Sequence, residues 1–180
     1  MPRLTSDPVL AIARGLVLFL TAVMAIASLG ALIAAPVALV LRDRVLVELS
    51  EKTHVAVPPE AVGAIVIMLL LAAAALALSY FSLRLLLRVV DTVAQGDPFV
   101  PVNGSRLIRM AWLMLAVQIV QIPLFGLGGW LGKALDGGHD QIHIAVELDF
   151  SALVLVLILV VLARVFRKGA EMRADLEGTV

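Results

Sequence analysis

The chain has 180 residues, of which 62% are hydrophobic and 16% are charged, whereas soluble domains contain roughly 45–50% apolar and about 25% charged residues. This composition excludes a disordered chain and a basic nucleic-acid-binding domain, and it indicates a membrane protein. Fourteen lysine and arginine residues balance fourteen acidic ones, and the absence of cysteine excludes disulfides and thiolate metal sites.

Four apolar segments are long enough to be membrane spans, because a helix needs roughly 20 residues to cross a hydrocarbon core of about 30 Å. They are residues 15–41, 61–83, 107–131 and 150–166. We expect the second helix to continue as an amphipathic helix until Gly96 and Pro98 end it, and the fourth to extend to about Leu176. The sequence predicts an all-α membrane protein, a four-transmembrane-helix bundle forming a single domain over residues 1–180.

The first apolar segment has one alternative interpretation. Ala25-Ile26-Ala27 resembles the small-residue cleavage site of a signal peptide, with Arg3 and Arg14 upstream. A cleaved signal peptide normally releases a polar segment, whereas this apolar run continues to Leu41. A retained transmembrane helix is the favoured interpretation.

The two loops on the other side of the membrane from the termini, residues 42–60 and 132–149, show an alternation typical of strands. Val45, Val47 and Leu49 alternate with other side chains, and residues 53–57 are rich in β-formers. Residues 142–148 alternate in the same way. We therefore expect a small extracytoplasmic β element formed by residues 44–57 and 141–148.

The distribution of basic residues predicts the orientation, because lysine and arginine accumulate in cytoplasmic segments. The N-terminus, the loop 84–106 and the C-terminal segment share one side and carry ten basic residues, namely Arg3, Arg14, Arg84, Arg88, Arg106, Arg109, Arg164, Arg167, Lys168 and Arg173. The opposite side carries Arg42, Arg44, Lys52 and Lys133. We expect a multi-pass protein of the bacterial cytoplasmic (inner) membrane, with both termini, the loop 84–106 and the tail 167–180 in the cytoplasm.

The deepest polar side chains of the third span are Gln118 and Gln121, since no span has a charged residue near its centre. They are three residues apart and share a helix face, so they are candidates for a polar path. The alternative is that they donate hydrogen bonds to neighbouring helices, typically worth about 0.6 kcal/mol each. The lack of charged residues argues against a proton-driven pump.

The histidines His54, His139 and His143 and nearby carboxylates have the chemistry of metal ligands. Their spacing matches no recognised zinc motif, so solvated loop histidines are the favoured interpretation. No nucleophile with a matching base and no phosphate-binding loop is present. The sequence therefore predicts a protein that is not an enzyme, with no catalytic residue, cofactor or metal ligand.

Two segments carry a family resemblance. The first is Gln95-Gly96-Asp97-Pro98-Phe99-Val100-Pro101-Val102-Asn103, followed by Arg106-Leu107 and Ala111-Trp112, and the second runs from Asp149-Phe150-Ser151 to the C-terminal Val180. Together they resemble the small bacterial four-span proteins of domain-of-unknown-function family twenty-nine seventy-five. The resemblance implies a bacterial inner-membrane protein with no assigned activity, often encoded beside a short helix-turn-helix regulator.

The motif-like segments contrast with the plain apolar spans and predict a non-enzymatic regulatory or accessory protein that engages a partner through its cytoplasmic loop and tail. We expect Asn103 to cap the third helix and Phe99 to pack between the second and third spans. The candidate partner-binding residues are Asp97, Pro98, Phe99, Asn103, Arg164, Arg167 and Lys168. The expected partners are the lipid bilayer and a cytoplasmic protein or a second copy of the chain, with no direct contact to nucleic acid. The alternative function is a small-molecule carrier or channel subunit with a polar path near Gln118 and Gln121.

Overall fold

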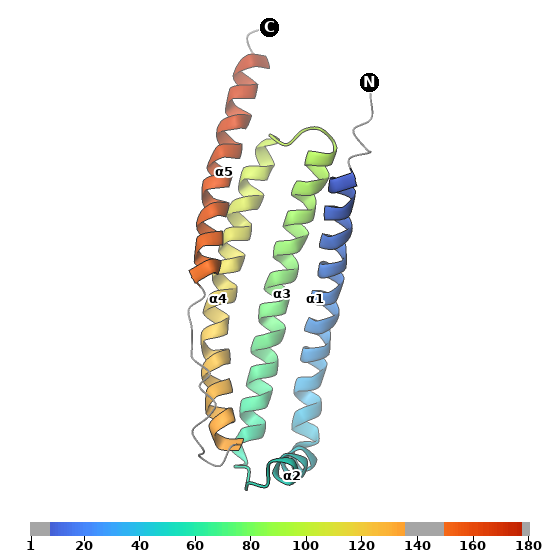
Figure 1. Cartoon of the computed structure of the whole chain (residues 1–180), viewed down its shortest axis with the longest axis vertical. Coiled ribbons are helices and arrows are strands. Elements are labelled where there is room, and N and C mark those ends of the chain that lie inside the picture. Colours follow the sequence, from blue (N-terminus) through green and yellow to red (C-terminus); the bar gives the residue numbers. More distant parts are fainter. Residues whose placement is uncertain (1–7, 136–149, 178–180) are drawn as a thin grey trace. The chain divides into compact units, whose positions relative to one another are not determined.

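The computed structural model describes residues 8–135 and 150–177, and these ranges contain five α-helices (Figure 1). They are α1 (Pro8–Val40), α2 (Arg42–Thr53), α3 (Glu60–Ala94), α4 (Pro101–Leu135) and α5 (Phe150–Glu177). Within the described ranges, four helices are long and apolar enough to cross a membrane, namely all except α2. The chain therefore has the fold of an all-α, multi-pass membrane protein.

Each predicted span is a helix, and the helices extend beyond the apolar segments. Proline begins α4, which suits a first helical position because its missing N–H would have no partner there. α3 ends at Ala94, and Gly96 follows with a φ of 82°, a left-handed conformation that costs glycine no Cβ clash. α5 continues to Glu177. The predictions for the ends of the second and fourth spans are confirmed.

The predicted β element is wrong for the first of its two segments. Residues 42–53 form the helix α2, residues 54–57 have no regular structure, and no strand occurs in residues 8–135 and 150–177. The second segment, residues 141–148, lies outside the described residues. The alternation of Val45, Val47 and Leu49 misled the prediction, because Val45 and Leu49 are also four residues apart and thus share a helix face.

Packing favours the helix in α2. Val45 and Leu46 both contact a buried cluster of Ala35, Val62 and Val66. Adjacent residues of a strand point to opposite faces, whereas adjacent residues of a helix are only about 100° apart and can reach one cluster. This requirement for two neighbouring apolar contacts decides in favour of the helix.

The ends of α2 also follow helix rules. Asp43 lies in its first turn and Lys52 in its last, where each charge complements the helix dipole. Lys52 Nζ donates a hydrogen bond to Glu48 Oε1 over 2.8 Å, one turn away. His54 caps the helix with a φ of 56°, and the prolines that follow prevent its continuation.

Contacts divide the chain into two compact units, and α1, α3 and α4 each contribute to both. Unit 1 comprises Met1–Met24, Leu78–Ala116 and Asp149–Val180, and unit 2 comprises Ala25–Ala77 and Val117–Leu148. In unit 2 the helices α1 and α3 are joined by a hydrogen bond in which Ser28 Oγ donates to the carbonyl oxygen of Ala73 over 3.0 Å. The α2 contacts described above belong to this unit.

The core of unit 1 lies where α3, α4 and α5 meet. Its buried members are Leu107, Met110 and Ala111 of α4 with Leu159 and Ala163 of α5, and Leu85 and Leu86 of α3 pack against them. Small residues bring α4 and α5 close together, since an ideal Cβ on Gly104 would lie only 3.2 Å from the carbonyl oxygen of Ala163. This core holds together the parts of α3, α4 and α5 that carry the candidate site.

Candidate functional site

The turn between α3 and α4, residues 95–100, contacts the end of α5. Arg173 Nη1 donates a hydrogen bond to Asp97 Oδ1 in an ion pair between residues 76 positions apart. Both side chains remain partly exposed to solvent, so the pair contributes little net stability by itself. The ion pair instead fixes the position of the turn relative to the end of α5.

Phe99 strengthens this attachment. The centroid of its ring lies 5.6 Å from that of Phe166 in a tilted arrangement, and the ring covers Gly169. An ideal Cβ on Gly169 would lie 2.5 Å from Phe99 Cδ1, closer than atoms can approach, so the ring fits only over a glycine. Phe99 thus contacts α5, a contact that the sequence did not predict. We call Asp97, Phe99, Phe166, Gly169 and Arg173 the loop–tail contact.

Asn103 holds the turn from within. It is completely buried, and its Nδ2 donates to Thr92 Oγ1 over 2.7 Å and to the carbonyl oxygen of Pro98 over 3.0 Å. Its Oδ1 accepts a hydrogen bond of 2.9 Å from Arg106 Nη1. The prediction that Asn103 caps the third helix is wrong, because α4 already begins at Pro101. The side chain connects the end of α3 to the start of α4 instead.

The basic residues of α5 lie beside the loop–tail contact. Arg164, Arg167 and Lys168 are all exposed, and Lys168 Nζ donates to Glu171 Oε2 over 3.2 Å. The side chains of Arg164 and Arg167 have no carboxylate partner among residues 8–135 and 150–177. Two guanidinium groups without a carboxylate partner in the described ranges are therefore exposed on α5.

The candidate partner-binding residues of the sequence thus separate into two groups. Asp97, Phe99 and Asn103 make contacts within the protein, and Pro98 supplies the carbonyl that Asn103 binds. Arg164, Arg167 and Lys168 remain at the surface. The structure brings all seven into unit 1, where the first group positions the elements that carry the second.

Gln118 and Gln121 belong to unit 2 and are half-buried. Gln118 already has an interaction partner within the chain. The polar path stays a prediction.

The described residues contain no group of three or more histidine or acidic side chains that could hold a metal ion. His54 is described, whereas His139 and His143 lie outside the described residues.

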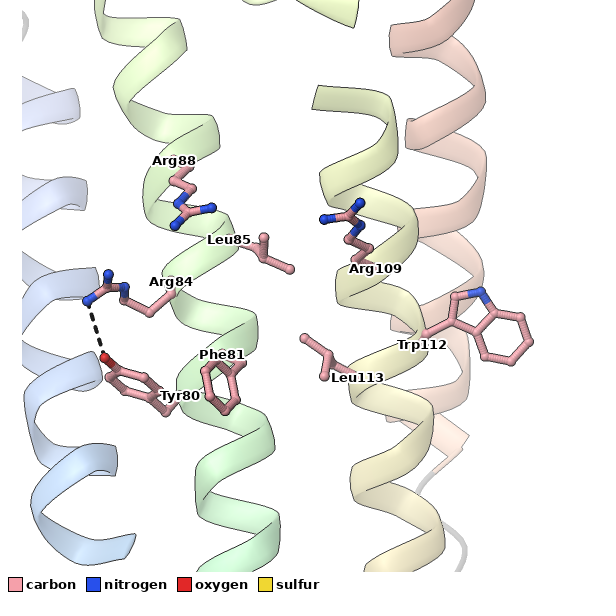
Figure 2. A pocket seen from close by; sticks show the side chains of 8 residues that line it. All are labelled: Tyr80, Phe81, Arg84, Leu85, Arg88, Arg109, Trp112 and Leu113. Atoms are coloured by element: carbon pink, nitrogen blue, oxygen red, sulfur yellow. Dashed lines mark hydrogen bonds between the residues drawn. The ribbon is translucent and has the colours of Figure 1, made fainter. Parts of the chain in front are cut away.

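A cavity of about 510 Å³ in unit 1 was not anticipated from the sequence. Its lining consists of Tyr80, Phe81, Arg84, Leu85 and Arg88 of α3 with Arg109, Trp112 and Leu113 of α4. Figure 2 shows Leu85 and Leu113 pointing into the space between α3 and α4, with the guanidinium groups of Arg88 and Arg109 above them. The cavity therefore has an apolar part and a basic part.

Arg84, another lining residue, contacts Tyr80 on the side of α3 that faces away from α4. Arg84 Nη1 donates to the Tyr80 hydroxyl over 3.2 Å, and its Cζ lies 5.7 Å from the centroid of the Tyr80 ring (Figure 2). Neither contact brings a negative charge to the guanidinium group. The sequence indicated this cavity only through its basic residues, which lie where two apolar segments end.

The four long apolar helices of the described residues are those of a helical multi-pass membrane protein. The chain belongs to the family described as "Protein of unknown function (DUF2975)", whose model matches residues 46–180. The match covers the chain from within α2 to its end, including the loop–tail contact and the cavity. This confirms the family predicted from the motifs. Comparisons with curated proteins and with solved structures give no match.

Proposed function

We propose that the protein is a non-enzymatic regulatory or accessory protein of the bacterial inner membrane, which binds a cytoplasmic protein through the end of α5. The chemistry of the exposed residues favours an acidic surface on that partner. The membrane assignment is supported by the four long apolar helices. The cytoplasmic side is supported by the accumulation of basic residues on the termini and the α3–α4 turn.

The observation that carries the proposal is the loop–tail contact. It holds the end of α5 against the α3–α4 turn through an ion pair and an aromatic contact. A surface that is fixed before binding loses less conformational entropy when a partner docks. Arg164 and Arg167, which have no carboxylate partner within the described ranges, are presented on this fixed element.

Substitution tests this function better than truncation. Ala163 is completely buried and Phe166 packs on the core of unit 1, so deletion of residues 163–180 would remove part of that core. The variant Arg164→Gln/Arg167→Gln/Lys168→Gln keeps the helix and removes three exposed charges. We expect it to recover roughly tenfold less partner from detergent extracts, because charged rims raise the rate of association.

The matched control is Arg84→Gln/Arg88→Gln/Arg109→Gln, which removes three charges at the cavity of unit 1. It should recover the partner as well as the native protein does. A photo-crosslinking amino acid at Arg167 should also capture the same protein in intact cells, whereas one at the exposed Ile119, within an apolar segment, should not. Equal recovery by both triple variants would contradict a role for α5.

The carrier or channel remains the alternative function. It requires water to reach Gln118 and Gln121, and the chain contains no cysteine that would interfere with labelling. Labelling of Gln118→Cys and Gln121→Cys by a water-soluble maleimide would favour this alternative.

A further inference from the structure

The cavity of unit 1 lies at the level where two helices leave their apolar segments. Arg84 is the first charged residue of α3 after Glu60, and Arg109 is the last charged residue of α4 before Lys133. The edge of an apolar span marks the boundary between hydrocarbon and headgroups. The basic part of the cavity thus coincides with the level of lipid phosphates, and its apolar part extends into the span.

The charge of the cavity is not compensated by the protein. Arg84, Arg88 and Arg109 have no carboxylate partner among residues 8–135 and 150–177. Neighbouring carboxylates in unit 1 are paired with other bases: Asp91 Oδ1 forms an ion pair with Arg14 Nε at 3.1 Å, and Asp97 forms one with Arg173. The cavity is accordingly complementary to an anion.

The remaining lining fits a hydrocarbon chain. Phe81, Leu85 and Leu113 supply the apolar surface below the arginines (Figure 2). Tyr80 and Trp112 are the residue types that accumulate at membrane–water interfaces, and Trp112 is 67% exposed. An occupant must therefore be anionic at one end and apolar at the other.

We propose that this cavity binds an anionic phospholipid. The guanidinium groups of Arg88 and Arg109, which face the space between α3 and α4, bind the phosphate (Figure 2). Arg84, which also lines the cavity, adds its charge from the opposite side of α3. An acyl chain lies along Phe81, Leu85 and Leu113. The proposal is independent of the protein partner of α5.

The test uses the purified full chain in detergent, titrated with phosphatidylglycerol or phosphatidylcholine, with bound lipid counted by native mass spectrometry. The native protein should bind phosphatidylglycerol in preference to phosphatidylcholine. Each arginine near a phosphate contributes roughly a fivefold change in affinity, so Arg88→Gln/Arg109→Gln should weaken phosphatidylglycerol binding about 25-fold. Arg84→Gln alone should weaken it by at most about fivefold.

The matched control is Arg164→Gln/Arg167→Gln, which removes two exposed charges from the same unit but outside the cavity. It should change phosphatidylglycerol binding by less than about twofold, because only general attraction is lost. Equal losses in the two double variants would overturn the proposal, as would equal binding of the two lipids by the native protein. Displacement of the lipid by millimolar inorganic phosphate would also overturn it, because the site would then bind small anions.

A second variant keeps every arginine. Leu113→Trp places a larger side chain in the apolar part of the cavity, and it should abolish the preference for phosphatidylglycerol while leaving all charges present. Thermal unfolding without added lipid shows whether the variant is folded. Normal phosphatidylglycerol binding by a folded Leu113→Trp protein would place the lipid elsewhere and overturn the proposal.

Discussion

Gly169 of α5 lies directly beneath the ring of Phe99, although the two residues are 70 positions apart in the sequence. A Cβ at position 169 would overlap the ring. The ring of Phe99 can therefore pack on α5 at this position because residue 169 is a glycine. The Asp97–Arg173 ion pair connects the same two elements. The turn and the tail are therefore held together by both shape and charge.

The first prediction concerns the packing of Phe99 on Gly169. Gly169→Ala should displace the Phe99 ring and lower the free energy of unfolding by about 1–3 kcal/mol, the range for an overpacked contact. Thermal unfolding in detergent would measure the loss. Gly15→Ala is the control, because a Cβ there meets nothing within 4 Å and improves helix propensity. If the two variants unfold at the same temperature, Phe99 is not seated on Gly169.

A second prediction concerns the buried amide of Asn103. Asn103→Ala removes two donated hydrogen bonds and one accepted one, and it leaves the carbonyl oxygen of Pro98 without its donor. An unsatisfied buried polar group costs about 1–3 kcal/mol, so the variant should unfold at a clearly lower temperature. Ser105→Ala, two residues away, removes an exposed hydroxyl that donates only within its own helix, and it should be nearly neutral. Equal stability of the two variants would show that Asn103 does not hold the turn.

A third prediction concerns orientation. Because the chain has no cysteine, Ser105→Cys and Glu51→Cys each introduce a single exposed thiol, one at the start of α4 and one on α2. In right-side-out vesicles an impermeant maleimide should label only Glu51→Cys, and permeabilisation should expose Ser105→Cys. Labelling in the opposite order would reverse the orientation inferred from the basic residues.

Properties that depend on one segment could be predicted from the sequence. The length of an apolar run determines whether a helix can cross a bilayer, and Gly96 ends α3 through its own backbone conformation. α2 could not be predicted in this way. The spacing of Val45 and Leu49 fits both a strand and a helix, and the packing of Val45 and Leu46 against the buried cluster of unit 2 decides between them.

The candidate site depends on contacts between distant segments, which explains why it was predicted only in part. The motif around Asp97 and Phe99 indicated an important turn, but nothing in it names Gly169 or Arg173 as the contacts. The cavity in turn requires Arg88 and Arg109 to lie on neighbouring faces of two helices. In the sequence these arginines were recognised only as signals of orientation.

The fourth prediction concerns the pair of Glu48 and Lys52 on α2. The Lys52 ammonium donates a hydrogen bond to the Glu48 carboxylate and adds its positive charge, so it lowers the pKa of Glu48, and the same contact raises the pKa of Lys52. The carboxylate therefore stabilises α2 above its unfolded pKa and loses this effect as the pH falls through its lowered folded pKa. The lysine stabilises α2 below its own unfolded pKa and loses this effect as the pH rises through its raised folded pKa. The pair is fully effective between these limits, at neutral pH.

This prediction is measured by the titration of the Glu48 side-chain carbon in an NMR spectrum of the detergent-solubilised protein. Lys52→Gln should return the pKa of Glu48 upward to its ordinary value, because both the hydrogen-bonded ammonium and its charge are lost. Lys52→Arg keeps a charged donor at the same helix spacing, so it should leave the pKa of Glu48 lowered. A Glu48 pKa that is the same in both variants would mean that residue 52 does not contact the carboxylate. The contact between residues four positions apart, which is expected only if α2 is helical, would then be absent in solution.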